Sequence, residues 1–164
     1  MSGSRSCTLV LLLASALNLA LMIPGGFVET RDFSAYTALI LGAFNLFLTV
    51  LGLGSFVLAY MVWRQGRGFW LSALAGLGYV AVYQADLQGL FPVTPVPMPA
   101  LLYLLEWLGT ALGALLFLAG LAGIRTAQTT SGAGEKLPRP VLFGLVFAGG
   151  SIILFATLAA MGAI

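Results

Sequence analysis

Two acidic residues lie inside long apolar stretches, and they are the strongest candidates for chemistry in this sequence. Asp86 stands five positions before Phe91, and Glu106 stands five positions after Leu101. If both stretches are helices, a rise of about 1.5 Å per residue puts both acids roughly 7 Å below their helix ends. Carboxyl groups at such depths usually face other helices and mark proton, ion or ligand sites, because exposing them to hydrocarbon is costly.

The segment PGGFVETRDFS is predicted to cover these acids. It contains Glu29, Arg31 and Asp32, in a chain of 164 residues with only 7 Lys or Arg and 5 Asp or Glu. Two carboxyl groups at one depth repel each other unless a proton or a cation intervenes. A guanidinium can meet a carboxylate through two hydrogen bonds. We therefore predict that Arg31 forms a salt bridge with Asp86 or Glu106, so that the segment acts as a lid.

Polar residues near the acids complete a candidate site. Its members are Asp86, Glu106, Arg31, Glu29, Tyr83, Gln84 and Gln88. Two interpretations stay open, which are structural pairing between helices and a polar pocket that binds a ligand. No residue is assigned a catalytic role, no metal site is expected, and the cofactor is unknown. The chain has no histidine and one cysteine, Cys7, which excludes His-ligated haem, histidine-based triads and an intrachain disulfide.

Composition predicts that these residues belong to a membrane protein. Hydrophobic residues make up 60% of the chain and charged residues 7%, whereas a soluble domain carries about 25% charged residues. A helix needs about 20 apolar residues to cross the hydrocarbon. The predicted fold class is an all-α integral membrane protein, with five transmembrane helices in one domain over residues 1–164. We expect the helices at about residues 8–27, 36–63, 69–91, 101–124 and 141–164.

The first apolar segment has a second interpretation. Arg5 followed by an apolar run resembles a signal peptide. The run ends at Pro24-Gly25-Gly26, which is not a convincing cleavage site, so we favour a retained first helix. If segment 8–23 is cleaved, the bundle has four transmembrane helices.

The third and fourth segments are predicted to form an antiparallel hairpin. They are joined by PVTPVPMPA, in which four prolines exclude a helix and favour an extended connection. Counting the same number of residues along each helix away from this connection places large side chains opposite glycines, as close packing favours. The expected pairs are Asp86 with Glu106, Tyr83 with Gly109, Tyr79 with Gly113, and Ser72 with Gly120.

The second segment carries a stripe of small and polar residues that includes Asn45 and Thr49. Small residues allow close approach between helices in lipid, so the stripe favours plain helix packing. A substrate path along Asn45 and Thr49 is the alternative.

Basic residues predict the orientation of the chain. Six of the seven fall on one side of the predicted bundle, and Arg31 is alone on the other. The majority are Arg5, Arg64, Arg67, Arg125, Lys136 and Arg139. Because cytoplasmic loops are enriched in Lys and Arg, we expect a cytoplasmic N-terminus and an outside C-terminus, in a bacterial or archaeal plasma (inner) membrane. Loops 28–35 and 92–100 would lie outside, and loops 64–68 and 125–140 in the cytoplasm.

Three functions fit this sequence. The favoured one is a non-enzymatic subunit or scaffold of a larger membrane assembly, with a polar site near its outer face. The alternatives are a small carrier or ion-coupled transporter that uses Asp86 and Glu106, and a quinone-binding or lipid-binding membrane protein. The expected partners are the lipid bilayer and either other membrane subunits or further copies of the chain. A net charge of +2 argues against nucleic acid as a partner.

Overall fold

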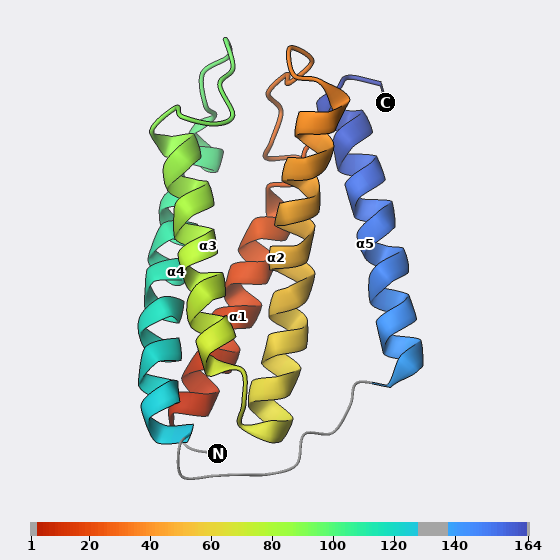
Figure 1. The fold of residues 1–164 in the computed structure, drawn as a ribbon. Helices are drawn as coiled ribbons and strands as arrows, with labels where there is room; N and C mark the ends of the chain where they lie inside the picture. Colours follow the sequence, from red (N-terminus) through yellow and green to blue (C-terminus); the bar gives the residue numbers. More distant parts are fainter. Residues whose placement is uncertain (1–2, 128–137, 164) are drawn as a thin grey trace.

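The computed structural model describes residues 3–127 and 138–163, and within them it contains five α-helices (Figure 1). The helices are α1 (Gly3–Leu21), α2 (Ala38–Gln65), α3 (Phe69–Leu87), α4 (Ala100–Ala127) and α5 (Arg139–Ala160). Most of the predicted loop 125–140, including Lys136, lies outside the described residues.

Several of the predicted helix bounds are wrong. The first helix runs from Gly3 to Leu21 instead of from 8 to 27, the third stops at Leu87 instead of residue 91, and the fifth stops at Ala160 instead of residue 164. Proline has no backbone N–H to continue a helix, and Pro24 is followed by Gly25 with a φ of 83°. After the third helix the chain turns away at Gly89, whose φ is 63°. Apolar side chains continue past both points, so hydropathy alone does not reveal them.

Four of the helices, α1, α2, α4 and α5, are long and apolar enough to cross a membrane. Helix α3 has 19 residues, as α1 has, and carries buried polar side chains that include Ser72, Tyr79 and Tyr83. The hydroxyls of Tyr79 and Tyr83 meet Ser55 of α2 and Asn18 of α1, which suits a helix placed inside a bundle.

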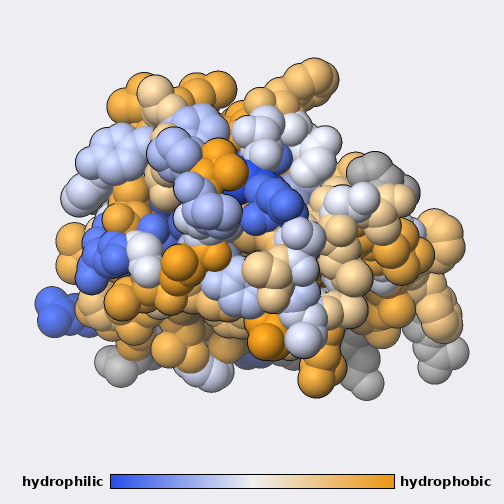
Figure 2. Space-filling model, turned by 90° about the horizontal axis from the view of Figure 1, so that it is seen from above, coloured by the Kyte–Doolittle hydropathy of each residue, from blue (hydrophilic) through white to orange (hydrophobic). Residues whose placement is uncertain are grey.

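The two ends of the bundle differ in charge. The segments between α1 and α2 and between α3 and α4 lie at one end, called here the loop end, together with the end of α5 (Figure 1). Arg64 and Arg125 occupy the last turns of α2 and α4 at the opposite end. The Arg5 side chain contacts Gly66 there as well. Seen from the loop end, hydrophilic residues extend from the middle to the left edge of a surface that is otherwise largely hydrophobic (Figure 2).

Helices α3 and α4 pack most closely, through glycines. A Cβ atom on Gly113 would lie 2.9 Å from the Tyr79 Cβ, and one on Gly109 would clash with the Tyr83 ring. Both predicted pairs are confirmed. Gly120 instead faces Ala73 and Phe69, where a Cβ would lie 2.6 Å from the Ala73 nitrogen.

The predicted partner of Gly120, Ser72, was therefore wrong by one residue. Positions three or four apart share a helix face. Phe69, Ala73 and Gly76 follow this spacing along α3, so they present the stripe that meets the α4 glycines. Ser72 is turned toward its own helix, where its hydroxyl donates to the Gly68 carbonyl at 3.0 Å.

Helix α5 lies at the side of the bundle. Among the described helices it packs only against α2, and α1 packs against α2, α3 and α4. Helices α1 and α5 therefore flank α2 without packing on each other. A polar contact between Asn45 Nδ2 and Thr157 Oγ1, 3.1 Å long, joins α2 to α5.

Candidate binding site

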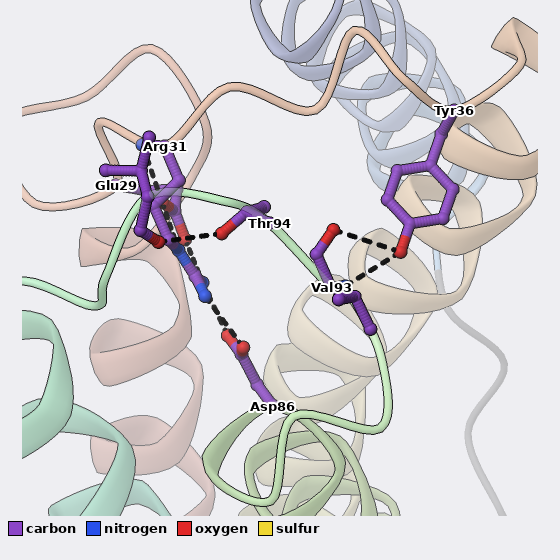
Figure 3. Close-up of polar contacts among 7 residues, drawn as sticks. Glu29, Arg31, Tyr36, Asp86, Val93 and Thr94 are labelled. Carbon is purple, nitrogen blue, oxygen red and sulfur yellow. Dashed lines mark hydrogen bonds and ion pairs between the residues drawn. The ribbon is translucent and has the colours of Figure 1, made fainter.

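Arg31 stands between two carboxylates at the loop end (Figure 3). Its Nε and Nη2 donate to the two Glu29 oxygens at 2.9 and 2.6 Å. Its Nη1 and Nη2 donate to the two Asp86 oxygens at 2.8 and 2.5 Å. The predicted salt bridge between the first loop and α3 is thus confirmed, as a double fork in which both carboxylates are held bidentately.

Acidic side chains on both sides of Arg31 fix the conformation of the loop by accepting hydrogen bonds from its backbone amides. The Arg31 amide donates to Glu29 Oε1 at 3.0 Å, so Glu29 holds both the backbone and the side chain of Arg31. The Ser34 amide donates to Asp32 Oδ1 at 2.8 Å. This hydrogen bond lowers the pKa of the exposed Asp32 carboxyl below its ordinary value. The buried Phe33 ring lies under the guanidinium, 5.4 Å from its central carbon.

Burial and charge act in opposite directions on Arg31. Burial alone would lower the pKa of the guanidinium, because it disfavours the charged form. The hydrogen bonds and charges of Asp86 and Glu29 outweigh burial and raise this pKa above its ordinary value. Arg31 is therefore a permanent cation in the site.

The two loops at this end are joined by a second contact. The Val93 amide donates to the Tyr36 hydroxyl at 2.7 Å, and that hydroxyl donates to the Val93 carbonyl at 3.3 Å (Figure 3). The rings of Tyr36 and Phe44 each meet the Phe91 ring edge-on, at 5.4 and 4.9 Å. The segment over the acids is consequently fixed on two sides.

Glu106 lies beneath the salt bridges and is 3% exposed. It lies next to Asp86, as the predicted hairpin register requires, and both residues line the same cavity. Two neighbouring carboxyl groups repel each other unless a proton or a cation lies between them. The Glu106 oxygen Oε2 is buried and has no hydrogen-bond partner within residues 3–127 and 138–163. Unpaired buried carboxyl oxygens are costly, so this atom is the unusual feature of the site.

A cavity of about 60 Å³ lies beside these groups. Five of the predicted site residues line it, which are Glu29, Arg31, Tyr83, Asp86 and Glu106. Asn45, which the sequence analysis placed on an alternative substrate path, lines it as well. The rest of the wall is apolar, including Leu48, Val82 and Leu102. A pocket with few polar groups among apolar walls is the common form of a small-molecule site.

Gln84 and Gln88, the other two predicted members, do not line this cavity. Gln84 Nε2 donates to Thr110 Oγ1 at 3.1 Å, and Gln88 Nε2 donates to Gln84 Oε1 at 3.2 Å. Positions four apart share a helix face, so the two glutamines occupy a different face of α3 from Tyr83 and Asp86. They are therefore not part of the cavity wall.

Sequence reasoning also left out a polar side chain below the site. Asn18 of α1 is buried, and its Nδ2 donates to the Tyr83 hydroxyl at 3.3 Å and to the Leu105 carbonyl at 3.1 Å. The signal was present, since an amide inside an apolar segment needs a partner. Asn18 holds Tyr83 in place at the cavity wall.

Residues 4–135 match the sequence profile of a family described as a domain of unknown function (DUF8051). The chain belongs to the DUF8051 family. No significant match was found among curated proteins or among solved structures.

The DUF8051 match includes all four charged residues of the site. It covers α1 to α4 and the four residues Glu29, Arg31, Asp86 and Glu106, whereas α5 lies beyond it. Within the part of this DUF8051 protein that the structure describes, no group of three His, Cys, Asp or Glu residues is arranged to hold a metal ion.

Proposed function

We propose that this DUF8051 protein is an integral membrane protein of five transmembrane helices that binds an amphipathic molecule near its outer face, without catalysing a reaction. In the proposed orientation the loop end faces outward, the N-terminus is cytoplasmic, and the membrane is a bacterial or archaeal plasma membrane. One observation carries the proposal. Glu106 is buried, its Oε2 has no hydrogen-bond partner within the described residues, and it lines a cavity that adjoins an apolar groove between α1, α2 and α5.

The groove is a second cavity, of about 90 Å³, directly beside the first. The two cavities adjoin each other, because both are lined by Leu19, Met22, Pro24, Asn45 and Leu48. The groove extends along α2 and α5, where its wall is mostly apolar. A polar headgroup at Glu106 would therefore be followed by space suited to an apolar tail.

The groove has an opening toward the proposed bilayer. A shallower hollow of about 440 Å³ lies between the end of α1 and the middle of α5, and it shares Ala20, Ile23 and Ile152 with the groove. Because α1 and α5 do not pack on each other, this gap is open at the side of the bundle. A lipid-like molecule would enter here without crossing water.

A second candidate function is a subunit or scaffold of a membrane assembly. It is favoured by the exposure of α5. Only 11% of the apolar 18-residue stretch of α5 that could cross a membrane is buried inside the bundle. Its exposed side chains include Phe143, Val146, Phe147 and Leu154. Such a surface is covered either by lipid or by a partner helix, and copurification distinguishes the two.

Filling the mouth of the groove tests the binding function. Ala20 is exposed at the mouth, and Leu17 is 59% exposed on the same helix without lining any of these cavities. We expect protein purified in native membrane discs to retain an amphipath that native mass spectrometry detects. Ala20→Trp should lose this molecule and Leu17→Trp should keep it.

Equal retention by the two variants, or no bound amphipath in the wild type, would refute the binding function. A copurifying membrane protein that is indifferent to Ala20→Trp would instead favour the subunit function. The same preparation therefore separates the two candidates.

A further inference from the structure

We propose that the amphipath bound by this protein carries a protonated amine as its headgroup, held by the Glu106 carboxylate. This inference rests on the proposed binding function and names its ligand class. It follows from the charges and the unused hydrogen-bonding capacity at the cavity.

The guanidinium has almost no capacity left for a ligand. Arg31 has five N–H groups, and four of them are directed at Glu29 and Asp86. The two bidentate pairs use all four carboxylate oxygens. An anionic headgroup would have to displace one of these carboxylates and would then stand beside both of the remaining acids.

Acidic groups outnumber the cation at the cavity. Glu29, Asp86 and Glu106 line it together with Arg31. The other elements at the wall, α1, α2 and α5, contribute no charged side chain to it. Opposite charges favour the ionised form of a carboxyl group and like charges disfavour it. The arrangement therefore favours a ligand with positive charge.

Glu106 Oε2 is the acceptor that such a ligand needs. It is buried and unpaired within the described ranges, and its residue lines the cavity. An ammonium group has three N–H donors and no acceptor. A bound ammonium would place a positive charge beside the neighbouring carboxyl groups of Asp86 and Glu106 and so reduce their mutual repulsion.

The surroundings favour an organic cation over a metal ion. Phe33, Phe44 and Tyr83 line the same cavity, and aromatic rings attract alkylammonium groups. Residues 3–127 and 138–163 offer no three-residue acidic cluster suited to a metal. The apolar groove then receives the alkyl chain, which a metal ion or a proton would leave empty.

Binding of dodecylamine and dodecanol to the full chain in neutral detergent tests this inference. The two probes share a tail and differ in headgroup charge. Losing a hydrogen bond to a charged group weakens binding about 10- to 100-fold. We expect wild type to prefer dodecylamine by that factor, and Glu106→Gln to lose the preference while still binding dodecanol. Asp32→Asn, which changes an exposed acid outside the cavity, should behave as wild type.

The outcomes distinguish a failure of the amine headgroup from a failure of the amphipath-binding function on which it rests. If dodecanol or a short-tailed quinone binds as tightly as dodecylamine, the groove binds amphipaths but the amine headgroup is wrong. If neither dodecylamine nor dodecanol binds, and Ala20→Trp changes nothing, the binding function itself fails. Retained dodecanol binding also shows that Glu106→Gln is folded. Unchanged amine preference in Glu106→Gln would overturn the assignment of Glu106.

Discussion

Arg31 holds two carboxylates through four hydrogen bonds, and its side chain is 4% exposed. Removing one member of a buried ion pair costs about 3 to 5 kcal/mol, because the remaining charge stays unpaired. Arg31→Ala should therefore lower the free energy of unfolding by about this amount, measured by denaturant titration in detergent. Glu29→Ala should cost less, since Arg31 keeps Asp86.

A double-mutant cycle shows whether Glu106 belongs to the same charge network. In the Arg31→Ala background, Glu106→Gln removes one of the acids left without a cation and should restore part of the lost stability. Additive effects of the two substitutions would contradict this coupling. Asp32→Ala is the matched control on the same loop, and a change at such an exposed position should stay within about 0.5 kcal/mol.

Much of the site could be predicted from the sequence at the level of single residues. Arg31 is the sole basic residue between the first two apolar segments, so its pairing with a carboxylate of the helices was predictable. The unpaired Oε2 of Glu106 was not, because the satisfaction of one oxygen depends on every side chain around it. The glutamines were misplaced because nearness in sequence does not fix the face of a helix on which a residue lies.

The contact between α3 and α4 is the element most sensitive to added volume. Around Gly113, a Cβ would lie 2.9 Å from both the Gly76 carbonyl oxygen and the Tyr79 Cβ. Backbone atoms cannot rotate away, so Gly113→Leu must separate the helices. We expect a loss of roughly 1 to 3 kcal/mol in unfolding free energy, as for other overpacked cores.

Gly54 of α2 is the matched control for this substitution, since no atom lies within 4 Å of the position that its Cβ would occupy. Gly54→Leu should leave stability nearly unchanged or raise it slightly through helix propensity. Equal losses in the two variants would mean that the α3–α4 contact is not tight. Thermal unfolding followed by circular dichroism is sufficient to distinguish them.

The number and order of the helices were predictable from apolar length, and the α3–α4 register from the proline-rich connection. The position of α5 was not. Its sequence is apolar on all sides, and hydropathy does not tell which apolar face meets a helix and which meets lipid. The groove between α1 and α5 depends on that choice, so it was visible only in the structure.

Orientation is the property of the whole molecule that most needs a direct test. Arg5, Arg64 and Arg125 lie opposite the loop end, whereas Arg31 lies at it. In a Cys7→Ser background, single cysteines at Thr30 and Val96, which are exposed at the loop end, should react with an impermeant maleimide in intact cells. A cysteine at Ser131, outside the described residues, should not react until the cells are opened. Reaction at position 131 alone would invert the proposed topology.

The salt-bridge pattern around Arg31 has a consequence for the order of events during synthesis. Arg31 precedes Asp86 by 55 positions, and at about 5 to 20 residues per second the acid is made roughly 3 to 11 s later. Glu29 lies two positions before Arg31 and is therefore already present when Arg31 is added to the chain. In the proposed membrane topology, this local pair would neutralise the guanidinium while the first two helices enter the membrane. Asp86 would then become the second partner of Arg31 once α3 has been made.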